Sequence, residues 1–184
     1  MAEKLHVIGI SGSLRAKSFN TSLLRAAQTL LPANMTLEAA DIGGVPLFNQ
    51  DLESNVPEAV VTLKRKIRDA DGLLIATPEY NYSIPGVLKN TIDWLSRPMK
   101  ESPLDGKPVA LIGAAGISGT IRAQMHFHNI AMFTNMRLLP RPQLYVQMAF
   151  QKFDGEGNLT DAMTREKLGQ LLAAFGDWIV RWKS

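Results

Sequence analysis

The sequence predicts an α/β fold of three layers, in which helices cover both faces of a parallel sheet. Two observations carry this prediction. Apolar runs of strand length alternate with segments of helical periodicity along the whole chain of 184 residues. The run at residues 72–76 is also fully apolar, as expected for a strand buried on both faces of a parallel sheet. We therefore place this run at the sheet centre and interpret residues 1–184 as a single domain.

The N-terminal part predicts two strands and one helix. Residues 5–10 form a short apolar run that opens into a loop rich in glycine and serine, which is typical of a buried first strand. Leucine and alanine then recur at helical spacing over residues 20–31, until Pro32 stops the helix. A weaker strand is predicted over residues 35–40. Two glycines and a proline predict a long surface loop over residues 41–55.

Two helices flank the central strand. Pro57 begins a helix that is predicted to run to about residue 70, with apolar side chains on one face. The helix after the central strand begins at Pro85 and ends before Pro98. The opposite face of the helix that begins at Pro57 is basic, and we interpret this face as solvated rather than as a nucleic-acid site. Its basic residues are Lys64, Arg65, Lys66 and Arg68.

The C-terminal part completes the alternation. Residues 107–113 form another buried strand, and a glycine-rich turn at 116–119 leads into a helix that ends at about residue 133. A last strand is predicted over residues 138–146, interrupted by two prolines. A terminal helix is predicted over residues 160–182. Ligands bind such sheets beyond the carboxyl ends of the strands, so the loops that follow the strands are the candidate sites.

Composition excludes several kinds of chemistry. The chain has no cysteine, which excludes disulfides, thiolate catalysis and cysteine-ligated zinc or iron–sulfur clusters. His126 and His128 lie two positions apart on a predicted helix and point in different directions, so we expect no metal site. No apolar run approaches the about 20 residues that cross a bilayer, and the N-terminus lacks a signal-peptide pattern. We expect a cytoplasmic protein without membrane insertion. Any redox chemistry would need a bound cofactor.

The loop after the first strand is suited to a phosphate. Residues 11–21 combine hydroxyl side chains, one amide and two cations immediately before a helix N-terminus. Backbone N–H groups and the helix dipole attract a dianion there, and a guanidinium adds a charge-assisted contact. The loop matches neither a GxGxxG nor a GxxxxGK[ST] pattern, so a monophosphate fits better than a pyrophosphate. Alternatively, the hydroxyl side chains only cap the helix and the turn.

The loop after the central strand is suited to a planar ring. Residues 77–86 place two tyrosines and an asparagine at the end of that strand, between two prolines that stiffen the loop. Aromatic faces and amide groups can pack against and hydrogen-bond a heterocycle. A role in surface packing or in a subunit contact is the alternative.

Three segments together resemble one known family. The segments GSLRAKSFN and TPEYNYSIPGVLKNTIDWLSR, with the glycine-rich turn at residues 113–119, are similar to the NADPH-dependent FMN reductase family and most similar to its quinone and chromate reductase members. The resemblance covers nearly the whole chain. It implies a flavodoxin-like fold with a five-stranded sheet of order 2-1-3-4-5. It also implies non-covalent FMN and assembly as a homodimer or homotetramer.

The same resemblance implies the cofactor-binding residues. Within the FMN phosphate loop they are Ser13, Leu14, Arg15, Ser18, Phe19 and Asn20, and direct contacts are expected from Ser13, Arg15, Ser18 and Asn20. The motif that lines the ribityl chain and the isoalloxazine edge comprises Pro78, Glu79, Tyr80, Asn81 and Tyr82. In the third turn, contacts are expected only from the backbone amides of Ala115 and Gly116. No catalytic side chain and no metal ligand is implied.

The implied function is the transfer of a hydride from NADPH or NADH, through bound FMN, to quinones or to similar acceptors such as chromate and azo compounds. Two alternatives stay open: a flavodoxin-type electron carrier, and a reductase that uses free FMN as a substrate. The sequence leaves undecided the physiological acceptor, the preferred nicotinamide, the choice between dimer and tetramer, and how tightly FMN is retained. It also leaves open whether Arg122 meets an NADPH phosphate, a neighbouring subunit or only solvent.

Overall fold

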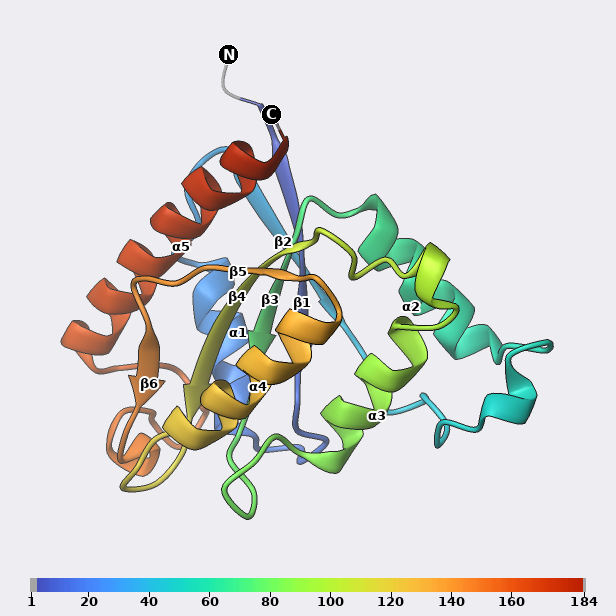
Figure 1. Cartoon of the computed structure of the whole chain (residues 1–184). Coiled ribbons are helices and arrows are strands. Elements are labelled where there is room, and N and C mark those ends of the chain that lie inside the picture. The colour runs from blue at the N-terminus through green and yellow to red at the C-terminus, as the bar shows by residue number, and fades with distance from the viewer. Residues whose placement is uncertain (1–2, 184) are drawn as a thin grey trace.

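The computed structural model describes residues 3–183 and contains one parallel sheet (Figure 1). Its strands follow the order β2-β1-β3-β4-β5, and β6 also pairs with β4. The fully apolar strand β3 lies between β1 and β4, so the predicted central position and the predicted order 2-1-3-4-5 are confirmed. The strands are β1 (Leu5–Ser11), β2 (Met35–Ala40), β3 (Gly72–Ala76), β4 (Pro108–Ala114), β5 (Arg137–Leu138) and β6 (Leu144–Val146).

The fifth position in the sheet is occupied by two short strands rather than one. Strand β5 pairs with the first residues of β4 and β6 pairs with the last, so both lie along the same edge. Pro140 and Pro142 stand between them and supply no backbone N–H for a ladder. The strand predicted over residues 138–146 is therefore split at its two prolines, and the described sheet has six strands where five were expected.

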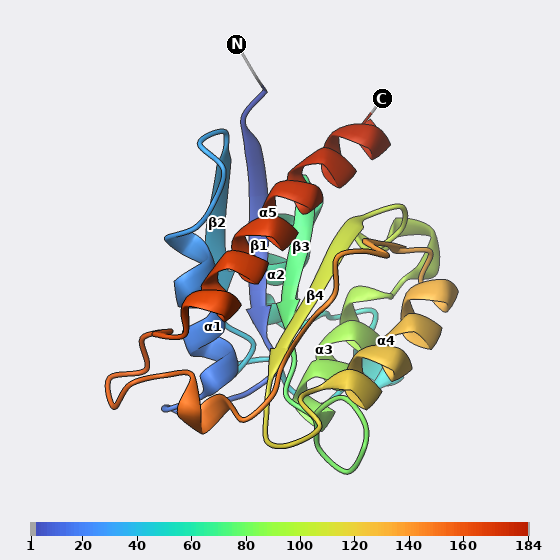
Figure 2. The ribbon, with the colours of Figure 1, turned by 90° about the vertical axis from the view of Figure 1, so that its left-hand side faces the viewer.

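Helices cover both faces of the sheet, as predicted. Leu74 and Ala76 of β3 pack in the core beneath α1 and α5, whereas Leu73 and Ile75 pack beneath α2, α3 and α4. This alternation follows from the two-residue period of a strand. Figure 2 looks onto the face that carries α1 and α5. The helices are α1 (Phe19–Gln28), α2 (Glu58–Asp69), α3 (Gly86–Leu95), α4 (Ile121–Phe133) and α5 (Ala162–Lys183).

The basic face of α2 is less solvated than its sequence suggested. Lys64 is buried, and its Nζ donates a hydrogen bond to the Arg97 carbonyl. Burial lowers the pKa of Lys64 because removal from water disfavours the charged form. Lys64 therefore ties α2 to the segment that follows α3, and only its neighbours on this face remain accessible to solvent.

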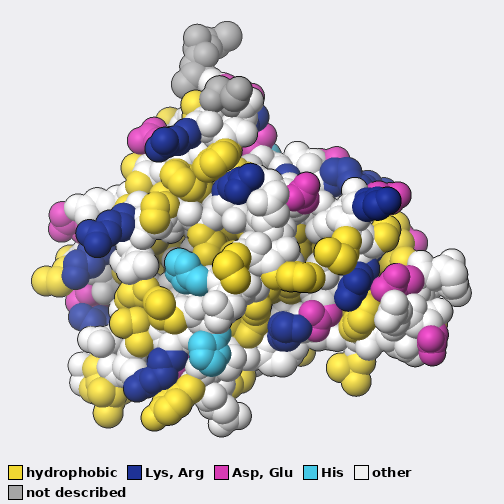
Figure 3. Space-filling model, in the orientation of Figure 1, with side chains coloured by type: hydrophobic (Ala, Val, Ile, Leu, Met, Phe, Trp, Pro, Cys, Tyr) yellow, Lys and Arg dark blue, Asp and Glu magenta, His cyan; other side chains and the backbone are white. Residues whose placement is uncertain are grey.

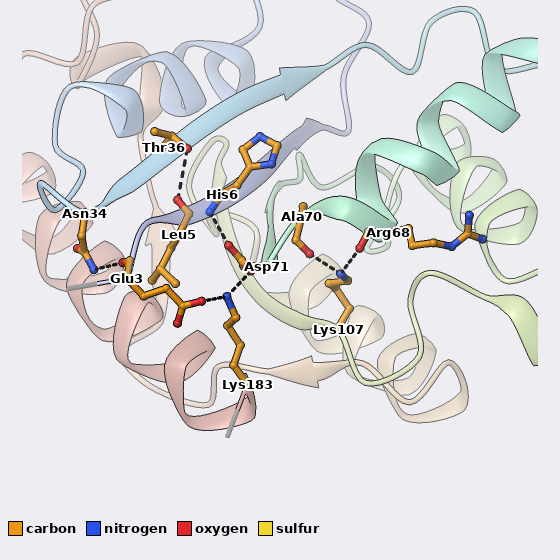
Figure 4. Close-up of polar contacts among 10 residues, drawn as sticks. All are labelled: Glu3, Leu5, His6, Asn34, Thr36, Arg68, Ala70, Asp71, Lys107 and Lys183. Carbon is orange, nitrogen blue, oxygen red and sulfur yellow. Dashed lines mark hydrogen bonds and ion pairs between the residues drawn. The ribbon is translucent and has the colours of Figure 1, made fainter. Parts of the chain in front are cut away.

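A polar network closes the amino-terminal end of the sheet (Figure 4). The Asp71 carboxylate accepts hydrogen bonds from the His6 N–H at 2.7 Å and from Lys183 Nζ at 2.7 Å. Lys183 also contacts Glu3, with 2.6 Å between Nζ and Oε1. Burial opposes ionisation of Asp71, but the bonds from Lys183 and His6 outweigh it and lower its pKa. This network joins the two ends of the described chain far from the carboxyl ends of the strands.

Within residues 3–183, the helices are all too short or too polar to span a membrane.

Candidate functional site

A groove of about 300 Å³ lies at the carboxyl ends of the strands. These ends are at the lower side of the molecule in Figure 1. The loops that follow β1, β3 and β4 form most of the groove, and the segment after β6 adds Phe150. This is where a parallel sheet of this order is expected to bind a ligand. The residues that line the groove are Ser13, Arg15, Ser18, Phe19, Asn20, Pro78, Glu79, Tyr80, Ala114, Ala115, Gly116 and Phe150.

The loop after β1 leads directly into the N-terminus of α1. Ser18 caps this helix, because its Oγ accepts hydrogen bonds from the N–H groups of Asn20 at 3.2 Å and Thr21 at 3.4 Å. Ser18 thus caps the helix, which is the role that the sequence offered as the alternative for the hydroxyl side chains of this loop. Three backbone N–H groups donate no hydrogen bond within residues 3–183: those of Lys17, Ser18 and Phe19. These donors at a helix N-terminus are available to an anion.

Arg15 supplies a cation at the edge of the same loop. Its guanidinium lies 5.4 Å from the centroid of the Phe19 ring, and it forms no ion pair with any residue of the described chain. Phe19 in turn packs on Phe153, with 5.3 Å between ring centroids. The positive charge of Arg15 is therefore held beside the groove without a protein counter-ion, as a phosphate site requires.

Asn20 lines the groove, but its amide is engaged by the fold. Nδ2 donates to the Ala114 carbonyl at 3.0 Å, and Oδ1 accepts from the Ala114 N–H at 2.9 Å. Only 3% of Asn20 is exposed. The amide therefore joins the start of α1 to the end of β4. The direct ligand contact expected of this residue stays a prediction.

Glu79 lines the groove, as expected, and its carboxylate is also engaged by the fold. Only 7% of its side chain is exposed, and Oε2 accepts hydrogen bonds from the Arg122 N–H at 2.9 Å and the Ala123 N–H at 3.2 Å. Arg122 Nη1 lies 3.1 Å from Oε1. The carboxylate therefore caps the N-terminus of α4 and holds Arg122 beside the groove. The fold thus gives Arg122 a partner that the sequence left unidentified.

The loop after β3 ends in a tight turn. The N–H of Tyr80 donates to the Ser83 carbonyl at 3.0 Å, and the N–H of Ser83 donates to the Tyr80 carbonyl at 2.9 Å. The two central residues, Asn81 and Tyr82, have φ values of 51° and 63°. The left-handed conformation is uncommon for tyrosine, so neighbouring contacts must hold it. One of them is Arg122, whose Cζ lies 4.1 Å from the centroid of the Tyr82 ring.

The third turn offers one of the two backbone amides that were expected to bind. The Ala115 N–H already donates to the Val146 carbonyl at 3.0 Å. Gly116, by contrast, donates no hydrogen bond within the described chain, and a Cβ at this position would point into open space. Gly113, just before this turn, packs so closely that a Cβ would lie 2.2 Å from Thr120 Oγ1. The amide of Gly116 therefore remains available to a ligand.

The structure brings most of the predicted residues together at the groove and leaves three outside its lining. Leu14 faces a second cavity, of about 590 Å³, between α1 and β2. Asn81 and Tyr82 form the tip of the loop instead of the groove wall. Sequence reasoning missed Ala114 and Phe150. Phe150 is 60% exposed and follows β6, and no local pattern distinguishes it from an ordinary surface aromatic.

The arrangement suits a flat ligand that ends in a phosphate. Available N–H groups and Arg15 lie at one end of the groove, and Tyr80, Gly116 and Phe150 lie along the rest of it. Among residues 3–183, no three histidine, aspartate or glutamate side chains are grouped as metal ligands.

Comparisons with known proteins identify related sequences and structures. Residues 5–151 match the model of a family described as NADPH-dependent FMN reductase. An NAD(P)H-dependent FMN reductase of Pseudomonas aeruginosa is 46% identical over 98% of both chains. A 2-hydroxy-1,4-benzoquinone reductase of Burkholderia sp is 42% identical over 97% of both chains. Among solved structures, a flavoenzyme NAD(P)H:(acceptor) oxidoreductase of Paracoccus denitrificans superposes with a TM-score of 0.89 at 35% identity, covering 96% of this chain and 98% of that one.

Proposed function

Because the chain belongs to the NADPH-dependent FMN reductase family, we propose that its groove binds FMN and serves electron transfer from NADPH or NADH to quinones. The predicted enzyme class, an NAD(P)H-dependent oxidoreductase of the quinone reductase type, is confirmed by relatives that share 40–46% of its residues over nearly the whole chain. The flavodoxin-type carrier is correspondingly disfavoured. FMN as the resident flavin, and the residues that hold it, are the parts that we propose.

One observation carries the assignment of FMN. The N-terminus of α1 presents backbone N–H groups that have no protein acceptor within the described residues, beside an arginine without a counter-ion. Such a site suits one phosphate dianion, and its loop lacks the glycine-rich fingerprint that binds a pyrophosphate. FMN ends in a single phosphate, whereas riboflavin has none.

The remaining residues of the groove fit the other end of the ligand. Tyr80 and Phe150 supply ring surfaces, and the Gly116 N–H supplies a hydrogen-bond donor. When bound, FMN supplies the two-electron chemistry, and the protein supplies binding, orientation and local charge. Asn20 and Glu79 line the groove and also position its loops through hydrogen bonds to the backbone.

We also propose that two or more copies of the chain assemble through α4. This helix exposes a stripe of large apolar side chains at helical spacing, on the face seen in Figure 3. Its exposed members are Ile121, Met125, Met132 and Phe133. Light scattering of the purified protein tests this proposal, and replacing Met125 and Met132 by glutamate should convert an oligomer into a monomer.

The proposed flavin site is tested by equilibrium titration of the flavin-free protein with FMN and with riboflavin. We expect FMN to bind at least tenfold more tightly, because only FMN can use the N-terminus of α1 and Arg15. Equal affinity for both flavins would contradict the phosphate site. Anaerobic addition of NADPH or NADH to the FMN-saturated protein should then bleach the flavin absorption. Loss of FMN on desalting would favour the alternative in which FMN is a dissociable substrate.

A further inference from the structure

A third hollow adjoins the groove and is bordered by cations. It encloses about 460 Å³ between the loop that carries Arg15 and Lys17 and the loop at residues 154–157. We call it the basic cleft. It shares Arg15 and Phe19 with the groove, so the two hollows meet along one wall. The basic cleft lies at the end of the groove where the FMN phosphate is proposed to bind.

Three cations border the basic cleft, and none is paired with a carboxylate in the described chain. They are Arg15, Lys17 and Arg25. Arg25 Nη2 donates to the carbonyls of Glu156 at 3.1 Å and Gly157 at 2.8 Å, which are neutral acceptors. The bonds fix the guanidinium in place and leave its charge uncompensated.

The loop at residues 154–157 approaches Arg25 closely. Gly157 has a φ of 81°, and a Cβ there would lie 2.7 Å from Ser22 Oγ and 3.0 Å from Arg25 Nη2. A glycine is therefore required for the loop to reach α1. Arg25 is thus held at the wall of the basic cleft, in contrast to an arginine that extends freely into solvent.

The acidic side chains beside the basic cleft are used by their own loop. Asp154 Oδ1 accepts hydrogen bonds from the N–H groups of Glu156 at 3.0 Å and Asn158 at 2.8 Å, and Oδ2 accepts from Asn158 Nδ2 at 3.0 Å. Glu156 Oε2 lies 3.4 Å from the same Nδ2. Donors of its own loop engage the Asp154 carboxylate, and neither Asp154 nor Glu156 forms an ion pair with the three cations in the described chain.

We propose that the basic cleft binds the 2′-phosphate of NADPH, through Lys17 and Arg25, and thereby makes NADPH the preferred nicotinamide. The inference rests on the proposed function, because the nicotinamide of the same molecule has to reach the groove. NADPH differs from NADH only by this phosphate on the adenosine ribose, so discrimination needs cations at a distance from the reacting ring. Arg15 faces the proposed FMN phosphate, which leaves Lys17 and Arg25 for the second anion.

The test uses FMN-saturated protein, so that the flavin phosphate site is already filled. Isothermal titration with 2′,5′-ADP and with ADP measures the contribution of the 2′-phosphate without any turnover. We expect 2′,5′-ADP to bind at least tenfold more tightly than ADP, and Lys17→Ala to remove most of that difference. Lys17→Arg should restore it. Lys100→Ala removes an exposed lysine far from the basic cleft and is the matched control for net charge.

Steady-state kinetics provide the second measurement. In Lys17→Ala, the ratio of kcat/KM for NADPH to kcat/KM for NADH should fall about tenfold, the size expected for losing one charge-assisted contact, while NADH turnover and FMN affinity stay at parental values. An unchanged ratio with intact FMN binding would overturn the inference and leave the proposed function standing. Absence of FMN binding or of turnover with both nicotinamides would overturn the proposed function. In that case equal binding of 2′,5′-ADP and ADP by the purified protein would also overturn the assignment of the basic cleft.

Discussion

The amide of Asn20 and the backbone of Ala114 form a reciprocal pair of hydrogen bonds, although they are 94 positions apart in the chain. The side chain offers one donor and one acceptor, as a neighbouring strand would, and so extends the ladder at the end of β4. Through this pair, the first turn of α1 and the turn after β4 are held at a fixed separation across the groove.

Replacing Asn20 by alanine should destabilise the protein by about 1–3 kcal/mol, because the buried N–H and carbonyl of Ala114 lose their partners. Urea denaturation measures this change. Gln28→Ala on the same helix is the control, since it removes only an exposed hydrogen bond and should cost little. Equal losses in the two variants would show that the Asn20 amide contributes no more than a surface contact.

Arg15→Ala should weaken FMN binding by about 1.5–3 kcal/mol, which is the loss of a hydrogen bond to a charged group. That corresponds to about a 10- to 150-fold rise in Kd. Fluorescence titration with FMN measures the effect, and the urea midpoint should stay at the parental value because Arg15 is exposed. Lys17→Ala should leave FMN affinity nearly unchanged. Parental affinity in Arg15→Ala would mean that the guanidinium serves only its contact with Phe19.

Nicotinamide and quinone should exclude each other, because both have to reach the same exposed face of the flavin that is proposed to bind in the groove. Each substrate would then react in turn with the flavin-loaded enzyme. Initial rates measured at several fixed benzoquinone concentrations with varied NADPH should give parallel double-reciprocal lines, as in a ping-pong cycle. Intersecting lines would show that both substrates occupy the enzyme together.

Asp161 should make the terminal helix sensitive to acid. Its carboxylate accepts hydrogen bonds from Lys152 Nζ at 2.8 Å, Thr164 Oγ1 at 2.6 Å and the Thr164 N–H at 2.9 Å. These contacts, with Lys152 first, lower the pKa of Asp161 from 3.8 to about 2. The lowered value belongs to the folded state, so the stabilisation is complete above pH 3.8 and is lost as the pH falls through about 2.

The comparison of the parent with Asp161→Asn isolates this charge. The difference between their Tm values should be largest near pH 6, shrink as the pH falls below 4, and vanish below about pH 2. Other carboxylates titrate in both proteins and cancel in the difference. A gap that is constant across this pH range would contradict the role of the ionised carboxylate.

The sequence predicted the alternation of elements and the place of the groove because both follow from local patterns. Period and apolar content identify β3 as the buried central strand, and strand direction then places the three loops at one end. The roles of Asn20 and Glu79 could not be predicted in the same way. An amide or a carboxylate in a loop has the same local signature whether it faces a ligand or caps a distant backbone, and their partners lie 94 and 43 positions away.

Burial and edge pairing account for the other differences. The helical period places Lys64 on a charged face of α2. Its ammonium group nevertheless donates a hydrogen bond to a carbonyl of the segment after α3. No sequence pattern near α2 predicts that contact. The prolines near residue 140 indicated an interruption. That both halves of the interrupted strand pair with β4 depends on the length and register of β4, which only the assembled sheet defines.

The contact between Glu3 and Lys183 has a practical consequence for engineering. Because these residues are joined by an ion pair of 2.6 Å at the amino-terminal end of the sheet, the first and last described elements can be connected by a short linker. New termini can then be opened at the exposed residues Ser54 and Asn55, which lie outside the groove lining. A circular permutant of this design would keep the order of strands in space while changing their order in the chain. Its flavin affinity would report whether the three loops need only their spatial arrangement, and not their order along the chain, to build the site.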